Sequence, residues 1–184
     1  MSEGRLKAVP LEAQDLDRAL TRMAHEILER NRGVEGLALV GIKTRGEVLA
    51  RRLAARIVRI EQPAQGLLVG ALDVTFYRDD TAARPARPAS ASELAFSVEG
   101  RTVVLVDDVL FTGRTVRAGL DAIADFGRPK AVRLAVLVDR GGRELPIQPD
   151  HVALVDRQVP LTHRVKVKLV ERDGSDEIVI EPRQ

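Results

Sequence analysis

The chain contains no cysteine and no tryptophan. Without cysteine, it can form neither disulfides nor a thiolate nucleophile nor cysteine-ligated zinc. Aromatic residues make up 3% of the 184 residues, too few for the stacked rings of a single-strand nucleic-acid platform. The three histidines, His25, His151 and His163, match no zinc-binding spacing. Carboxylates, hydroxyls and basic groups therefore remain as candidates for the chemistry.

Long apolar runs are also absent. No run approaches the about 18 apolar residues of a membrane helix, and residues 1–14 lack the apolar core of a signal peptide. We therefore expect a cytoplasmic protein with no membrane partner. The 29 basic and 27 acidic residues nearly balance, which argues against gripping nucleic acid through bulk charge, and we expect no DNA partner.

The apolar pattern predicts one α/β domain over 1–184, with a mostly parallel sheet covered on both faces, because strand-like runs alternate with helix-like spacings. Apolar residues at helical spacing lie over 16–28 and 48–60, and again over 116–126. Predicted strands are 37–42, 68–77, a run starting at Val103, and 132–138. Alternation over 165–169, followed by 178–180, predicts a C-terminal antiparallel hairpin.

The segment 78–96 has no apolar period, is rich in Ala, Ser and Pro, and is too long for an ordinary connection. It is predicted to be a flexible loop that acts as a lid.

The most informative stretch is Val103–Thr115, where an apolar run meets Asp107 and Asp108 and continues through a Thr-Gly-Arg-Thr turn into a helix. Backbone N–H groups at a helix N-terminus favour a phosphate, and neighbouring carboxylates suit sugar hydroxyls. The pattern therefore favours a ribose 5-phosphate ligand. One aspartate could instead only cap the helix, or the pair could form a metal or phosphorylation site. A Walker lysine motif is absent.

A second polar loop, Lys43-Thr44-Arg45-Gly46, follows another predicted strand. Its cations around a tight turn suit a more highly charged anion such as pyrophosphate, although a solvated turn would look the same. Together the two loops describe a site for a phosphoribosyl donor.

The chain resembles the PyrR family, whose members regulate pyrimidine operons and also act as uracil phosphoribosyltransferases. The resemblance rests on 41–46, 72–80, 106–115 and 137–146, and it covers nearly the whole chain. It implies the type I phosphoribosyltransferase fold, with the C-terminal hairpin forming part of a hood.

The resemblance also implies the catalytic site. Asp107 and Asp108 would hold the ribose hydroxyls of phosphoribosyl pyrophosphate (PRPP) and Mg²⁺, directly or through PRPP and water. Arg78 would help to close the loop over pyrophosphate, and Arg140 and the backbone near Val165 would face uracil. The remaining PRPP contacts would come from Lys43, Thr44, Arg45, Gly46, Val109, Leu110, Phe111, Thr112, Gly113, Arg114 and Thr115.

For regulation, the resemblance implies binding of UMP or UTP and of the leader mRNA of the pyrimidine operon, by a homodimer or a larger homo-oligomer. Thr21 and His25, four residues apart on one helix face, would join Arg30 and Arg143 in the RNA surface. An exposed face of this kind could also be merely solvated.

The chain departs from the family pattern on the side of the RNA and base contacts. Gly142 stands where the family usually has His, and Gln148 where Arg is usual. The segment 147–160 is longer than expected, and Leu161-Thr162 replaces Thr-Ser. A phosphoribosyltransferase for another nucleobase, with no RNA-binding role, therefore remains an alternative.

Overall fold

The computed structural model describes residues 13–77 and 92–183, with the side chain of Ala13 left out. Arg78 and most of the predicted lid therefore lie outside the described residues. Within this described part, no helix is both long and apolar enough to cross a membrane.

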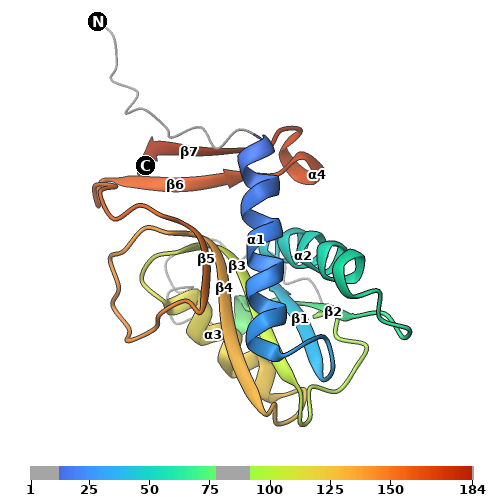
Figure 1. Cartoon of the computed structure of the whole chain (residues 1–184). Helices are drawn as coiled ribbons and strands as arrows, with labels where there is room; N and C mark the ends of the chain where they lie inside the picture. Colours follow the sequence, from blue (N-terminus) through green and yellow to red (C-terminus); the bar gives the residue numbers. More distant parts are fainter. Residues whose placement is uncertain (1–12, 78–91, 184) are drawn as a thin grey trace, which may run out of the picture.

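A five-stranded parallel sheet forms the centre of the molecule (Figure 1), in the order β2-β1-β3-β4-β5. The strands are β1 (Leu37–Ile42), β2 (Leu68–Leu72), β3 (Thr102–Leu110), β4 (Ala131–Asp139) and β5 (His151–Val155). The chain passes from β1 to β2 on one side and then to β3 on the other. The strand order thus reverses between β1 and β3, and open α/β sheets bind ligands beyond the carboxyl ends of strands at such a point.

Helices cover both faces of the sheet, as the sequence predicts. The helices α1 (Ala13–Asn31) and α2 (Arg45–Glu61) lie on one face, and α3 (Arg114–Ala124) lies on the other (Figure 1). The alternation of β3 divides its side chains between them, because Val104 and Val106 pack with α1 and α2 while Val103 and Leu105 pack with α3. Every residue of β1 is buried.

The predicted C-terminal hairpin is confirmed as β6 (His163–Lys168) paired antiparallel with β7 (Glu177–Pro182). A four-residue helix, α4 (Val170–Asp173), lies between the two strands and ends at Gly174, whose φ of 77° few other residues adopt. Val167 and Ile178 are buried in the core shared with α1 and α2, which seats the hairpin on that side of the domain.

Two predictions of local structure need correction, and one strand was not predicted. The predicted strand 68–77 ends at Leu72, because the Asp73 carboxylate accepts the Thr75 N–H (2.9 Å) and starts the short 3₁₀ helix η1 (Thr75–Tyr77). Within the predicted loop 78–96, Glu93 forms a β-bridge with Ala71. Strand β5 was not predicted, since its five residues carry only a weak alternation.

Candidate active site

The two aspartates of the β3 motif lie on opposite sides of the strand. Asp107 is buried, with 6% of its surface exposed, and it lines a cleft at the carboxyl end of β3. Asp108 is partly exposed, and its carboxylate accepts the Val109 N–H (3.0 Å) while its own N–H donates to Asp107 Oδ1 (2.9 Å). The strand continues to Leu110, so both aspartates lie near its carboxyl end. Side chains alternate along a strand, and of the two carboxylates only that of Asp107 lines the cleft.

The cleft has a volume of about 430 Å³, within the range of small-molecule sites. Gly113 precedes α3 with a φ of 92°, and a side chain there would also approach Leu145 and Ile147 at 3.4 Å. The turn thus brings the first residues of α3 to the cleft, as the sequence predicts. The lining residues are Asp107, Val109, Leu110, Phe111, Thr112, Gly113, Arg114, Thr115, Val116, Glu144 and Arg183.

The segment after β4 closes one side of this cleft. The carbonyl oxygen of Thr112 accepts the N–H groups of Glu144 (3.0 Å) and Leu145 (3.1 Å). The Glu144 carboxylate in turn lies 2.6 Å from Nε of Arg114. The negative charge of Glu144 is therefore balanced by an arginine at the start of α3.

The loop 43–46 lies beside β3 because two glycines permit close backbone contact. A side-chain carbon at Gly46 would lie 2.3 Å from the Val106 carbonyl oxygen, and one at Gly41 would lie 2.3 Å from the Gly46 carbonyl oxygen. The peptide bond between Lys43 and Thr44 is cis. The start of α2 is thus packed directly against the backbone at Asp107.

Both cations of this loop have acidic partners. Nζ of Lys43 lies 2.7 Å from Glu93, and Nη2 of Arg45 lies 2.8 Å from Asp173 of α4. Arg45 Nε is buried and makes no hydrogen bond within the described part of the chain. The hairpin region therefore reaches the predicted pyrophosphate loop through Asp173, a contact that sequence spacing could not indicate.

Arg140, expected near the base, is 3% exposed and donates to the backbone that leads into β6, at His163 O (2.7 Å) and Pro160 O (3.1 Å). Its Cζ also lies 4.2 Å from the ring centroid of Phe111. Burial, and next the charge of Arg183, lower the pKa of the Arg140 guanidinium below its ordinary value. Arg140 thus fastens the hairpin to the loop after β3.

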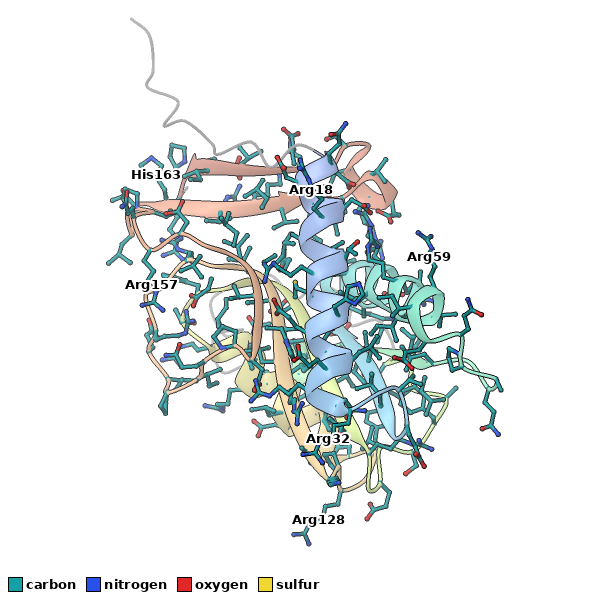
Figure 2. All side chains as sticks on the ribbon, in the orientation of Figure 1. Arg18, Arg32, Arg59, Arg128, Arg157 and His163 are labelled. Carbon is teal, nitrogen blue, oxygen red and sulfur yellow. The ribbon has the colours of Figure 1, made fainter. Side chains whose placement is uncertain are left out.

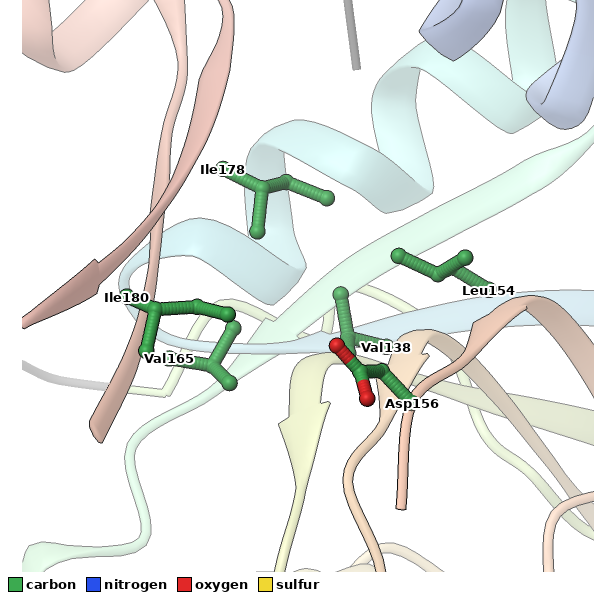
Figure 3. Close-up of a pocket in the computed structure, with 6 residues that line it drawn as sticks. All are labelled: Val138, Leu154, Asp156, Val165, Ile178 and Ile180. Carbon is green, nitrogen blue, oxygen red and sulfur yellow. The ribbon is translucent and has the colours of Figure 1, made fainter. Parts of the chain in front are cut away.

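Val165 lines a second, smaller pocket, which lies between β4, β5 and the hairpin (Figure 3). Its other lining residues are Val138, Leu154, Asp156, Ile178 and Ile180. The Asp156 carboxylate is the polar group among these apolar side chains. Arg140 and Val165 therefore both lie where the hairpin meets the sheet, but they line different spaces.

The residues predicted for RNA binding fall in two places. Thr21, His25 and Arg30 lie on α1, where His25 is exposed and Arg30 pairs with Asp150 at 2.9 Å. Arg143 lies after β4, where its guanidinium donates to the backbone oxygens of Ile147 and Phe111. Figure 2 shows further arginines at separate points around the outline of the molecule, labelled Arg18, Arg32, Arg59, Arg128 and Arg157.

Three residues that line the cleft, Val116, Glu144 and Arg183, were not predicted as site residues. Glu144 lies inside a motif that the sequence singles out, whereas Arg183 follows the last strand with no local signal. Among the residues that the structure describes, no group of at least three metal-ligating side chains gathers at one place.

Comparison with known proteins identifies the family. Residues 11–173 match the model of the phosphoribosyl transferase domain. A protein of Leifsonia xyli named bifunctional protein PyrR is 57% identical over 178 residues, which cover 94% of this chain and 96% of that protein. A bifunctional protein PyrR of Streptomyces coelicolor is 51% identical over 92% of this chain and 87% of its own. The chain belongs to the PyrR family of phosphoribosyltransferases.

Solved structures support the fold of this PyrR-family chain. A hypoxanthine phosphoribosyltransferase of Trypanosoma cruzi superposes with a TM-score of 0.72 at 18% identity, over 97% of this chain and 96% of that one. A hypoxanthine phosphoribosyltransferase of Staphylococcus aureus gives a TM-score of 0.67 at 17% identity, with the same coverage. The predicted type I phosphoribosyltransferase fold is therefore confirmed.

One departure from the PyrR pattern has a structural counterpart in this cleft. Gly142 has a φ of 76°, and a side-chain carbon there would lie 2.4 Å from Cε2 of Phe111. The Phe111 ring thus occupies the space into which a side chain at 142 would project.

Proposed function

We propose that this PyrR-family protein transfers the phosphoribosyl group of PRPP to uracil, giving UMP and pyrophosphate, and that it also regulates the pyrimidine operon. The observation that supports the enzymatic part is the cleft at the carboxyl end of β3, where buried Asp107 and the turn before α3 line one space. Such a cleft suits a ligand with sugar hydroxyls at one end and a phosphate at the other.

In this proposal each loop holds one part of PRPP. Asp107 and Asp108 accept hydrogen bonds from the ribose hydroxyls, and the segment 109–115 binds the 5′-phosphate through backbone N–H groups and hydroxyls. The loop 43–46 holds the pyrophosphate, to which Arg78, outside the described residues, adds a charge. Arg140 and the backbone near Val165 lie on the uracil side.

The reaction is a displacement at the anomeric carbon. The bond from C1′ to the pyrophosphate oxygen breaks, the bond from uracil N1 to C1′ forms, and the N1 proton is released. None of the described cleft residues is placed as a covalent nucleophile, so the protein acts by positioning and by charge. Exclusion of water from the closed cleft would protect the activated sugar from hydrolysis.

Mg²⁺ fits the donor set of this site. It is usually bound through one or two carboxylates together with substrate phosphates, and Asp107 offers a carboxylate at the cleft. Asp107 and Asp108 would hold the ion, either directly or through water. When bound, Mg²⁺ neutralises the charge of the leaving pyrophosphate.

For regulation we propose that UMP or UTP promotes binding of leader mRNA, and that Thr21, His25, Arg30 and Arg143 contribute to that surface. With 3% aromatic residues, recognition would rest on phosphates and 2′-hydroxyls rather than on stacking. We further propose that the protein acts in the cytoplasm as a homodimer or larger homo-oligomer.

The enzymatic proposal is tested by incubating the protein with PRPP, Mg²⁺ and either uracil, hypoxanthine or guanine, and separating the products by chromatography. UMP is expected from uracil, and Asp107→Asn, at the carboxylate that lines the cleft, is expected to abolish its formation while keeping the wild-type circular dichroism spectrum. Conversion of a purine base without UMP formation would instead assign the protein to another nucleobase.

Regulation is tested separately by titrating the leader RNA of its own operon with protein, with and without UMP. Tighter binding in the presence of UMP is expected. Equal or absent binding in both titrations would remove the attenuation role from this member of the family and leave the enzymatic proposal intact.

A further inference from the structure

A cation directly after the hairpin lines the cleft that contains the turn before α3. Arg183 follows β7, and its N–H donates to the carbonyl oxygen of Thr162 (2.8 Å), which fixes its backbone beside the start of β6. Its guanidinium carbon lies 4.6 Å from the ring centroid of Phe111. Arg183 lines the same cleft as the segment 112–115, although about seventy positions separate them in the sequence.

Stacking on Phe111 orients the Arg183 guanidinium but does not neutralise its positive charge. A cation over an aromatic ring is attracted to the face of the ring, which orients the side chain and leaves its N–H groups available. Among the residues that the structure describes, no carboxylate pairs with Arg183, in contrast to Arg114, which pairs with Glu144. Within the described part of the chain, the Arg183 charge at the cleft therefore has no acidic partner.

A second guanidinium, that of Arg140, adds positive charge beside Phe111 and so favours binding of an anion there. Arg140 also lies over the Phe111 ring, is buried, and is fixed by backbone carbonyls at His163 and Pro160. Burial lowers the pKa of the Arg140 guanidinium, and the charge of Arg183 lowers it further, because two nearby cations repel each other. Because Arg140 cannot move away, a bound anion between Arg183 and the start of α3 would relieve the repulsion.

We propose that Arg183 is a substrate-binding residue that contacts the 5′-phosphate of PRPP and of UMP from the hairpin side. This inference rests on the proposed function, because it extends the phosphate site formed by 112–115. A phosphate dianion there would accept backbone N–H groups from one side and the Arg183 fork from the other. Arginine suits this role because its planar fork matches two phosphate oxygens.

The test compares Arg183→Gln with Arg164→Gln by isothermal titration calorimetry. Arg164 lies on the same hairpin but pairs with Glu181 at 2.6 Å and does not line the cleft, so its variant removes the same charge elsewhere. The ligands are UMP, ribose 5-phosphate and uridine. For Arg183→Gln we expect the Kd of UMP and of ribose 5-phosphate to rise about tenfold, or about 1.4 kcal/mol, with no change for uridine.

Arg183→Lys keeps the charge without the fork, and it is expected to recover part of the lost affinity. Arg164→Gln is expected to bind all three ligands as the wild type does, and thermal melts of every variant check the fold. An unchanged Kd of UMP in Arg183→Gln overturns the inference. Equal loss of UMP and uridine also overturns it, because the contact would then lie on the nucleoside.

Failure of the proposed function gives a different pattern. In that case the wild-type protein itself binds neither UMP nor PRPP and forms no UMP from uracil. A wild type that is active and an Arg183→Gln variant indistinguishable from it would reject only the role of Arg183.

Discussion

The guanidinium of Arg143 forms an ion pair with Asp139, with 2.7 Å between Nη2 and Oδ1. Asp139 is the last residue of β4 and is 2% exposed, so its charge is almost fully removed from water. Arg143 also donates from Nε to Ile147 O (2.8 Å) and from Nη1 to Phe111 O (3.0 Å). The residue therefore connects the end of β4 to the loop after β3.

Arg143→Gln is expected to lower the free energy of unfolding by about 3 kcal/mol, because it leaves the Asp139 carboxylate buried without its main partner. Urea unfolding followed by circular dichroism measures this. Arg157→Gln is the matched control, since Arg157 lies 3.9 Å from the same carboxylate with 69% of its side chain exposed. Equal stability of the two variants would contradict the structural role of Arg143.

The proposed RNA contact of Arg143 makes a separate prediction that does not depend on stability. If its guanidinium also reaches an RNA phosphate, the slope of log Kd against log salt becomes shallower by about 1 in Arg143→Gln. The slope does not depend on the fraction of folded protein. Fluorescence anisotropy titrations at several salt concentrations give it, and Arg30→Gln tests the α1 part of the surface in the same way.

The pH dependence of stability is expected to depend on His151. This side chain is 3% exposed, and its Nε2 has no hydrogen-bond partner among the described residues. Burial lowers the pKa of His151 below 6.5, against the opposing charges of Asp150 and Glu26. Below its ordinary pKa, the unfolded chain binds a proton that the folded chain does not, so stability decreases as the pH falls from 7 toward 5.

His151→Leu is expected to remove the contribution of His151 to the pH dependence of the free energy of unfolding. That contribution amounts to at most about 1.4 kcal/mol per pH unit. Urea midpoints at pH 7, 6 and 5 measure it, and His25→Leu on the exposed face of α1 controls for the loss of a histidine. A His151→Leu protein with the wild-type slope would show that other groups cause the pH dependence.

Gly142 and Gly141 allow a test of the space around Phe111. Both have positive φ, 76° and 72°, so alanine at either position costs about 1 kcal/mol of backbone strain. At Gly142 the new carbon would also lie 2.4 Å from Cε2 of Phe111, whereas at Gly141 the nearest atom is Cγ of Arg157 at 3.4 Å. Only Gly142→Ala is therefore expected to displace the ring and to weaken UMP binding.

Calorimetry with UMP and urea unfolding of both glycine variants measure these effects. In the double variant Gly142→Ala with Phe111→Leu, the smaller side chain at 111 is expected to restore part of the stability. UMP affinity that falls equally in Gly141→Ala and Gly142→Ala would show that backbone strain, and not the ring, is responsible.

Arg52 anchors the hairpin region to α2. Its guanidinium donates to Glu171 from Nε (2.8 Å) and to Asp176 from Nη1 (2.9 Å), while its side chain is 15% exposed. Arg52→Ala is expected to lower the free energy of unfolding by about 3 kcal/mol, since it leaves two carboxylates without their cation.

Hydrogen exchange of peptides from 163–182 should become faster in this variant, whereas peptides from 131–139 should exchange as in the wild type at early times. Arg51→Ala, whose side chain is 62% exposed, is the matched control.

The elements of this fold could be predicted where burial follows one simple period. Strand β1 is buried throughout and β3 ends in a recognisable polar loop, so both were located from the sequence. Strand β5 was missed because its five residues carry only a weak alternation, and its pairing with β4 depends on tertiary packing. The end of β2 was missed because one Asp73 side chain competes with the strand.

The candidate site likewise contains parts that could be predicted from the sequence and parts that could not. The loops 43–46 and 111–115 carry their own local signals of glycines, hydroxyls and cations next to strand ends. The contacts of Asp173 with Arg45 and of Arg183 with Phe111 arise only when the hairpin folds back on the sheet. Such contacts join residues far apart in the sequence, and no local pattern encodes them.

The close approach of Gly46 to Val106 has a consequence for how members of this fold can diverge. The span between the loop 43–46 and the end of β3 is set by main-chain atoms in close approach, with no side chain between them. Exchanging the residues at 43–45 therefore alters charge and hydrogen bonding without altering that span. Under the proposed function, a donor of fixed length would therefore keep its fit while the acceptor side is free to change.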